Sequence, residues 1–129
     1  MRYLGIDYGD KRVGVAISDE MGEFAFPYAV IKNSKSILDE VCSIIDKKQI
    51  AEVAVGESLD SDGNPNLIQK DIDEFCANLK SRVPTPVFLE QEFWTSMQAK
   101  KFQGENELHD ASAAAIILQT FLDRKRNMI

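Results

Sequence analysis

The opening of the chain constrains the fold most, because it has the pattern of two short strands joined by a tight turn. Apolar side chains alternate with polar or small ones through residues 3–8 and 12–18, which is the period of two that β-strands show. Gly9 and Asp10 supply the turn. Asp7 ends the first strand, where a carboxylate needs solvent, a hydrogen-bond donor or a cation. It is therefore either a turn residue that bonds nearby backbone N–H groups or a functional acid.

Strand and helix patterns alternate along the rest of the chain. In order, they predict a third strand over residues 24–31, a helix after Ser36, a strand over 51–56, a loop over 57–66, a helix after Asn66, a strand over 87–89, a short helix after Thr95 and a last helix from near Asp110 to Arg124. Pro27 places the third strand at a sheet edge. This order predicts an α/β fold, with an antiparallel meander of three strands, two further parallel strands and flanking helices.

Size and composition indicate one soluble domain spanning residues 1–129, with 44% hydrophobic and 28% charged residues. Cys42 and Cys76 do not form a CxxC pair, so a zinc cluster is not expected, and a reducing cytoplasmic location is the simplest interpretation. No apolar run approaches the length that crosses a bilayer. The net charge of −6 counts against strong non-specific binding to nucleic acid, but a carboxylate-rich metal site is compatible with it.

Two motifs carry a resemblance to a known family. The first strand and turn read Gly5-Ile6-Asp7-Tyr8-Gly9, and the second strand begins Lys11-Arg12-Val13-Gly14-Val15-Ala16. Near the other end the chain reads His109-Asp110-Ala111-Ser112-Ala113-Ala114. Both resemble the YqgF/RuvX family of Holliday junction resolvases and pre-16S rRNA nucleases. The resemblance implies an RNase H-like fold and a metal-dependent nuclease for pre-16S rRNA 5′-end processing or Holliday junction resolution.

The resemblance also implies site residues. Asp7, Glu92 and Asp110 would be catalytic and would hold Mg²⁺ or Mn²⁺, a cation that prefers such oxygen ligands. From the sequence alone, Asp110 is better explained as the N-cap of the last helix, and it is the resemblance that makes a site carboxylate the favoured interpretation. Nucleic acid, the expected partner of a monomer or weak homodimer, would contact the basic residues Arg12, Lys11, Lys100 and Lys101. The alternatives are an ion pair of Arg12 with Asp10 or Asp19 and solvated helix ends for the two later lysines.

One motif departs from the family pattern. Where the family has Asp-Glu-Arg, this chain has Gln91-Glu92-Phe93, which removes one carboxylate and one phosphate-binding guanidinium. Glu57, after the fourth strand, is either a substitute carboxylate or a solvated loop acid. The sequence therefore leaves an alternative function, a catalytically weakened RNase H-like module that binds nucleic acid or protein. A small-molecule phosphotransferase is less favoured, because the chain is too short for two lobes.

Overall fold

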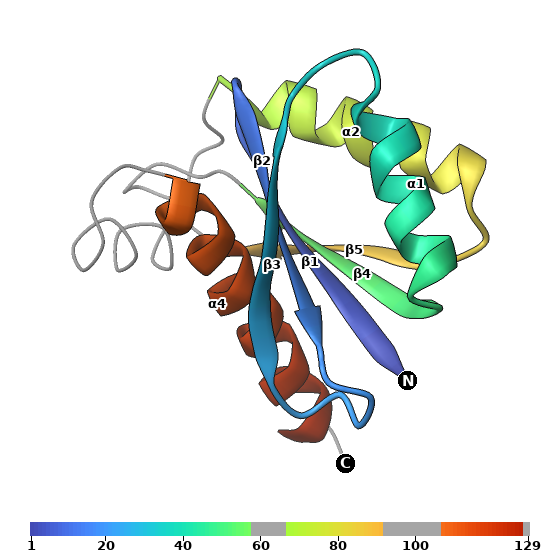
Figure 1. The fold of residues 1–129 in the computed structure, drawn as a ribbon, viewed down its shortest axis with the longest axis vertical. Coiled ribbons are helices and arrows are strands. Elements are labelled where there is room, and N and C mark those ends of the chain that lie inside the picture. The colour runs from blue at the N-terminus through green and yellow to red at the C-terminus, as the bar shows by residue number, and fades with distance from the viewer. Residues whose placement is uncertain (58–66, 92–106, 128–129) are drawn as a thin grey trace.

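Five strands and three helices make up the described part of the chain. The computed structural model describes residues 1–57, 67–91 and 107–127. The elements run β1 (Arg2–Tyr8), β2 (Arg12–Ser18), β3 (Ala25–Lys32), α1 (Ile37–Lys47), β4 (Ile50–Glu57), α2 (Gln69–Arg82), β5 (Val87–Gln91) and α4 (Glu107–Asn127). Figure 1 shows them as one twisted sheet with helices on both sides. The predicted order of these elements is confirmed.

The sheet is mixed, with strand order β3-β2-β1-β4-β5. β1 pairs antiparallel with β2, which pairs antiparallel with β3, while β4 adds parallel to β1 and β5 parallel to β4. The predicted meander with two parallel additions is therefore correct. β1 is central and β3 is an edge strand, as Pro27 indicated.

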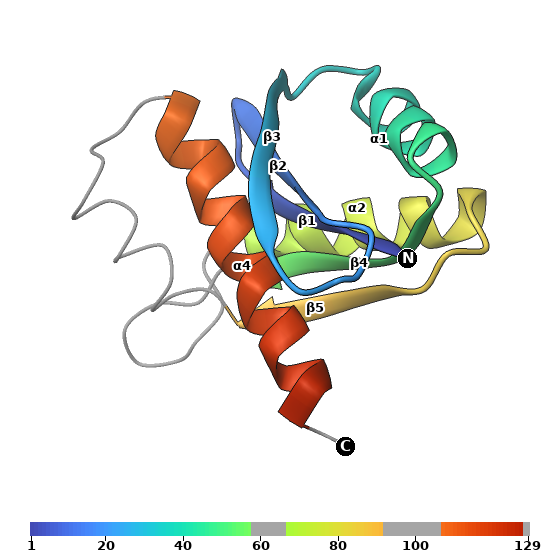
Figure 2. The same cartoon turned by 60° about the horizontal axis from the view of Figure 1, so that its bottom comes forward.

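The two faces of the sheet bury separate apolar clusters. Branched side chains of the strands, among them Leu4, Ile6 and Val15, pack against α1 and α2 in the larger cluster. Small strand residues, Ala16 and Ala54, meet α4 in the other cluster. Figures 1 and 2 show α4 on one side of the sheet and both other helices on the opposite side. Of the helices in the described ranges, none is long and apolar enough to cross a membrane.

Several predicted boundaries were wrong. The last helix begins at Glu107, so Asp110 lies inside its first turn and is not its N-cap. α2 begins at Gln69 with Ile68 as N-cap, later than the prediction from Asn66. β4 runs on to include Glu57, which was expected in a loop, because the extended pairing with β5 continues to this residue. The short helix predicted after Thr95 lies outside the described residues.

Candidate active site

Asp7 lies at the carboxyl end of the central strand, on the face that α4 covers. Its backbone pairs with Gly14 of β2. On the other side, the register that pairs Ile6 with Val55 places Asp7 level with Gly56 of β4. Since side chains alternate along a strand, Asp7 shares the face of Gly5, whereas Tyr8 packs against Phe75 of α2 on the other face. Asp7 is half-buried between two neighbours that have no side chains.

Gly5 brings α4 unusually close to β1. A Cβ atom at Gly5 would lie 2.6 Å from Cβ of Leu118 and 2.8 Å from the carbonyl oxygen of Ala114, distances that real Cβ contacts do not show. Asp110 precedes Ala114 by four residues, about one helical turn. Figure 1 shows that the N-terminal end of α4 lies toward the β1–β2 turn and its C-terminal end toward the β2–β3 turn. The helix backbone therefore carries Asp110 to the end of the sheet where Asp7 is found.

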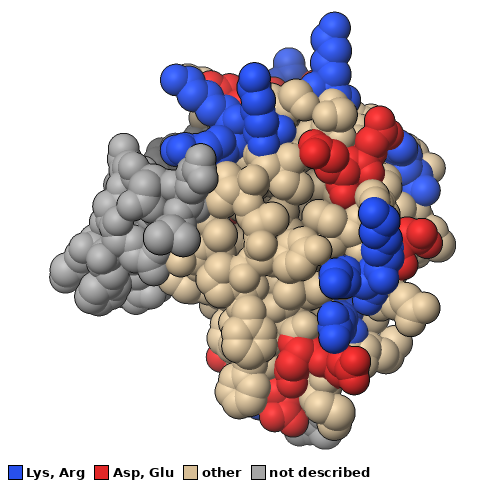
Figure 3. Space-filling view, viewed as in Figure 1, with Lys and Arg blue, Asp and Glu red and all other residues tan. Residues whose placement is uncertain are grey.

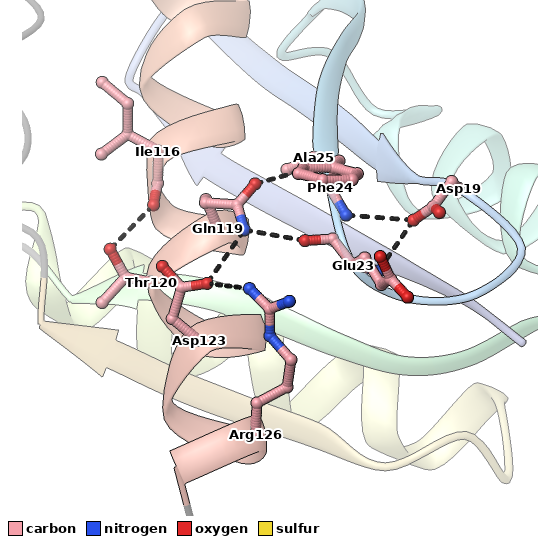
Figure 4. Close-up of polar contacts among 9 residues, drawn as sticks. All are labelled: Asp19, Glu23, Phe24, Ala25, Ile116, Gln119, Thr120, Asp123 and Arg126. Atoms are coloured by element: carbon pink, nitrogen blue, oxygen red, sulfur yellow. Dashed lines mark hydrogen bonds and ion pairs between the residues drawn. The ribbon is translucent and has the colours of Figure 1, made fainter.

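Gln119 fixes α4 against the turn between β2 and β3. Its side-chain carbonyl accepts a hydrogen bond from the Ala25 N–H at 2.9 Å, and its amide donates to the Glu23 carbonyl at 2.9 Å and to the Asp123 carboxylate at 3.1 Å. Asp19 shapes the same turn, because its carboxylate accepts the N–H groups of Glu23 and Phe24 (Figure 4). These bonds lower the pKa of Asp19, with the Phe24 N–H the largest cause. Together, the hydrogen bonds of Gln119 and Asp19 set where α4 lies along the sheet.

Glu90 is a buried acid that the sequence analysis did not single out. Its side chain in β5 is 1% exposed, and the Arg124 guanidinium of α4 lies 2.7 Å from one carboxylate oxygen. Neither oxygen has a partner with hydrogen-bond geometry among the described residues. Burial raises the pKa of Glu90, Arg124 opposes the rise, and the charge of Glu57 adds to it. Glu90 lies two residues after Phe88 on β5, so the two side chains share one face of the sheet. Phe88 contacts Phe121 of α4, and this shared face was the available indication that Glu90 faces the same helix.

Glu57 and two basic residues complete the described part of this sheet end. Glu57, half-exposed at the end of β4, pairs in register with Gln91 of β5. It therefore stands on the strand next to the position where the family motif has lost a carboxylate. Lys11 and Arg12 are exposed in and after the β1–β2 turn. The predicted site thus brings Asp7, Glu57 and two cations to one end of the sheet.

Other predicted site residues are only partly described. The backbone of Asp110 lies in α4, but its side chain is outside the described part, as are Glu92, Lys100 and Lys101. Within residues 1–57, 67–91 and 107–127, the side chains that are described include no group of three His, Cys, Asp or Glu residues that could hold a metal ion. The ligand set of Asp7, Glu92 and Asp110 stays a prediction.

Comparison with known proteins decides the family. A family model described as "RuvX: Holliday junction resolvase" matches residues 1–124. The chain belongs to the RuvX family. Relatives named "Putative pre-16S rRNA nuclease" include one from Maridesulfovibrio salexigens, which is 36% identical over 96% of this chain and 99% of its own length. Another, from Sulfurihydrogenibium, is 33% identical over 95% of this chain and 90% of its own length.

Solved structures agree with the RNase H-like fold expected of a RuvX protein. RuvC of Thermus thermophilus, in a complex with a Holliday junction substrate, superposes with a TM-score of 0.65 at 17% identity, covering 98% of this chain and 96% of RuvC. The Holliday junction resolvase of fowlpox virus gives 0.60 at 13% identity, covering 96% of this chain and 99% of that chain. At such identities the likeness concerns the fold.

Of the predicted metal ligands in this RuvX chain, Asp7 is the one whose side chain the structure describes. Asp7 offers carboxylate oxygens, the ligands that Mg²⁺ prefers. The glycines at its level on both neighbouring strands add no side chain that would fill the space above it. The first turn of α4, with Asp110 in it, covers the same face of the sheet. The carboxylate chemistry of Asp7 therefore suits such an ion.

Proposed function

We propose that this chain is a metal-dependent nuclease that hydrolyses phosphodiester bonds in structured nucleic acid. The observation that carries the proposal is the position of Asp7, at the carboxyl end of the central strand and on the face that α4 covers closely. Ligand sites of open α/β sheets lie outside the carboxyl ends of their strands. The names of the relatives point to precursor 16S rRNA as the substrate, with branched DNA as the second candidate.

The proposal assigns a role to each candidate site residue. Asp7, Asp110 and Glu92 would hold Mg²⁺ or Mn²⁺, which when bound lowers the pKa of water and offsets charge on phosphoryl oxygens. Lys11 and Arg12 would hold a phosphate of the substrate near Asp7, with the Arg12 guanidinium able to make two parallel hydrogen bonds. Glu57 would replace the carboxylate lost at Gln91, because the two residues are register partners on adjacent strands, about 4.8 Å apart.

The altered motif favours a second candidate, a module of the same fold that binds nucleic acid or protein with little or no cleavage. Gln91 has an amide where the family has a carboxylate, and the loss of one charge-stabilising group costs about 10²–10³ in rate. The two candidates differ in what Asp7 does, because only the nuclease requires its carboxylate.

Cleavage of labelled RNA and DNA in Mn²⁺ separates these candidates. We expect slow cleavage by the wild type, none by Asp7→Asn, and a loss with Glu57→Gln nearly as large. Asp10→Asn is the matched control, since it makes the same chemical change at an exposed residue of the adjacent turn, and it should cleave like the wild type. A wild type that cleaves no faster than Asp7→Asn would remove the nuclease and leave the binding module. A silent Glu57→Gln would make Glu57 a surface acid.

A further inference from the structure

The edge strand β3 exposes a row of aromatic rings that the core does not use. Phe26 is 52% exposed and Tyr28 is 44% exposed, and Phe24, just before the strand, is 55% exposed. The register pairs Phe26 with Ile17, whose side chain belongs to the cluster under α1 and α2. The Phe26 ring therefore extends that face of the sheet into solvent, and exposed aromatic surface indicates a binding site.

The backbone of β3 is poorly suited to pair with a further strand. Pro27 has no N–H to donate. The register also shifts beside it, because Ala16 pairs with Pro27 while the preceding Val15 pairs with Ala29, leaving Tyr28 as an extra residue. Proline and a bulge are devices that protect edge strands from strand addition. The exposed rings are therefore better explained by a partner that binds side chains than by one that extends the sheet.

A cation lies against the row. The Lys48 ammonium, at the end of α1, is 5.7 Å from the centroid of the Tyr28 ring, within the range of a cation–π contact. Lys47 beside it is exposed. Figure 3 shows Lys and Arg side chains gathered at the right of this face, where α1 ends in the view of Figure 1. A ligand stacked on Tyr28 would therefore meet positive charge.

A second group of cations, here called the cation cluster, lies at the far end of β3. It consists of four exposed residues, Lys11, Arg12, Lys32 and Lys35. Arg12 and Lys32 are direct register partners, so their two cations stand side by side at the edge of the sheet. Figure 3 shows Lys and Arg side chains at the top of the same face, with an uncharged surface below them.

Both features lie on the edge strand β3, but on different faces of the sheet. Phe26 shares the face of Ile17, whereas Arg12 and Lys32 alternate with Val13 and Ile31, which pack on that face, and so point to the α4 face that carries Asp7. A path that joins the rings to the cations therefore crosses the exposed edge of the sheet toward the candidate active site.

Tyr28 and Lys32 are four residues apart on β3, which is about 13 Å. The cation cluster adjoins the end of the sheet that carries Asp7, because Tyr8 pairs with Val13 and Arg12 comes next. At the other end, acidic residues of the β2–β3 turn, Glu20 and Glu23, adjoin Phe24 and would repel phosphate. The path is therefore bounded at Phe26.

We propose that Phe26 and Tyr28, here called the β3 platform, stack two unpaired bases of a single-stranded segment of the substrate while the cation cluster holds its phosphates. Aromatic side chains with flanking cations are the usual means of binding single strands without sequence preference. This inference rests on the proposed function for the identity of the ligand, and it adds that the substrate is single-stranded beside the site of cleavage.

Fluorescence anisotropy tests the proposal without cleavage, with labelled RNA or DNA single strands of about 12 nucleotides and the matching duplexes, in EDTA. We expect the wild type to bind single strands more tightly than duplexes. Phe26→Leu should weaken single-strand binding about fivefold to a hundredfold, the range for removal of one stacked ring, because leucine keeps the apolar surface and removes the ring. Tyr28→Phe, which keeps the ring, should bind like the wild type, and Tyr28→Leu should not.

The cation cluster gives a second, independent readout. Lys32→Ala with Lys35→Ala should reduce the dependence of log K on log salt by about 0.7 for each phosphate that the protein no longer neutralises, whereas Phe26→Leu should leave this slope unchanged. Phe88→Leu is the matched control on the other edge strand, where Phe88 is 42% exposed, and it should leave binding intact. Circular dichroism should show that all variants are folded. Comparing the affinities for RNA and DNA single strands shows which kind of nucleic acid the platform accepts.

Three results would overturn the proposal: a wild type that binds no single strand, platform variants that bind single strands like the wild type, or platform variants that change only the oligomeric state in sedimentation. The last would assign the rings to a second copy of the chain. Failure here leaves the nuclease proposal standing, because the Asp7→Asn cleavage assay does not depend on the platform. Conversely, if single-strand binding depends on the platform but the wild type does not cleave nucleic acid, the binding module would be favoured.

Discussion

The two faces of the sheet are covered in different ways, and the candidate active site belongs to only one of them. Toward α1 and α2 the strands present branched side chains such as Leu4 and Val55, both fully buried. Toward α4 they present Gly5, Ala16 and Ala54, so the helix backbone comes very close to β1. Bulky residues fill space and stabilise the fold, whereas small ones let an element approach. Only the second kind of packing lets the first turn of α4, which contains Asp110, approach the face of the sheet that carries Asp7.

The faces also differ in how their helices are attached. The face under α1 and α2 is held mainly by apolar contacts. α4 adds polar contacts from side chains spread along its length, through Gln119 to the β2–β3 turn, Arg124 to the buried Glu90 and Lys125 to Glu52 at 2.6 Å. Apolar packing is tolerant of small sliding movements, but directional bonds are not. We infer that these bonds fix the position of α4 along the sheet.

The largest expected effect comes from comparing Leu4→Ala with Gly5→Ala, neighbours on opposite faces. Leu4→Ala should lower the free energy of unfolding by about 2–5 kcal/mol, because it leaves a cavity. Gly5→Ala should lower the free energy of unfolding by about 1–3 kcal/mol through overpacking against Leu118. It should lower the cleavage rate of the folded protein much more than Leu4→Ala does, because the added methyl group forces α4 to move. Urea unfolding and single-turnover cleavage at low temperature measure both quantities.

This comparison fails if Leu4→Ala and Gly5→Ala reduce cleavage equally once the folded fraction is taken into account. In that case the close approach of α4 would contribute packing alone. Ile6→Val is a milder control on the Leu4 face, with an expected loss of about 0.5–1.5 kcal/mol and an unchanged cleavage rate.

Much of the fold and some of the site could be predicted, for different reasons. Period-two patterns and Pro27 indicated the strands, their order and the edge position of β3, because these depend on local residue types. The start of α4 was misplaced because Asn106 and Asp110 are both residue types that begin helices, and the sequence does not decide between them. Glu90 was not singled out, since its burial depends on Arg124, which lies far along the chain and meets it only in the folded sheet. The catalytic role proposed for Asp7 came from the family resemblance, because strand pattern alone left a turn residue as the alternative.

Gln119→Ala should have a smaller effect, confined to the α4 face. It removes the bonds to the Ala25 N–H and the Glu23 carbonyl, and net contributions of about 1 kcal/mol per bond predict a loss of about 1–2 kcal/mol in the free energy of unfolding. Thr120→Ala removes only an exposed bond within the helix and should change stability by less than about 0.5 kcal/mol. Equal losses for the two variants would show that Gln119 does not anchor α4.

The smallest effect concerns pH and Glu90. Burial raises the pKa of Glu90 in the folded protein, so the folded state binds more protons than the unfolded state between the ordinary pKa of glutamate and the raised value. Stability contributed by this group therefore falls as pH rises through that window. Glu90→Gln should remove this fall, so its stability relative to the wild type should increase with pH. A difference between the two unfolding curves that is independent of pH would contradict the assignment.

The most direct test of the central claim, that Asp7 and Asp110 meet across the α4 face at one divalent ion, is a double-mutant cycle of Mn²⁺ affinity by electron paramagnetic resonance. Wild type, Asp7→Asn, Asp110→Asn and the double variant are titrated under the same conditions, with Asp10→Asn as control. If the two carboxylates hold one ion, each single variant should lose most of the affinity and the double variant little more, a strongly non-additive result. Additive losses, or wild-type affinity in either single variant, would contradict the shared site.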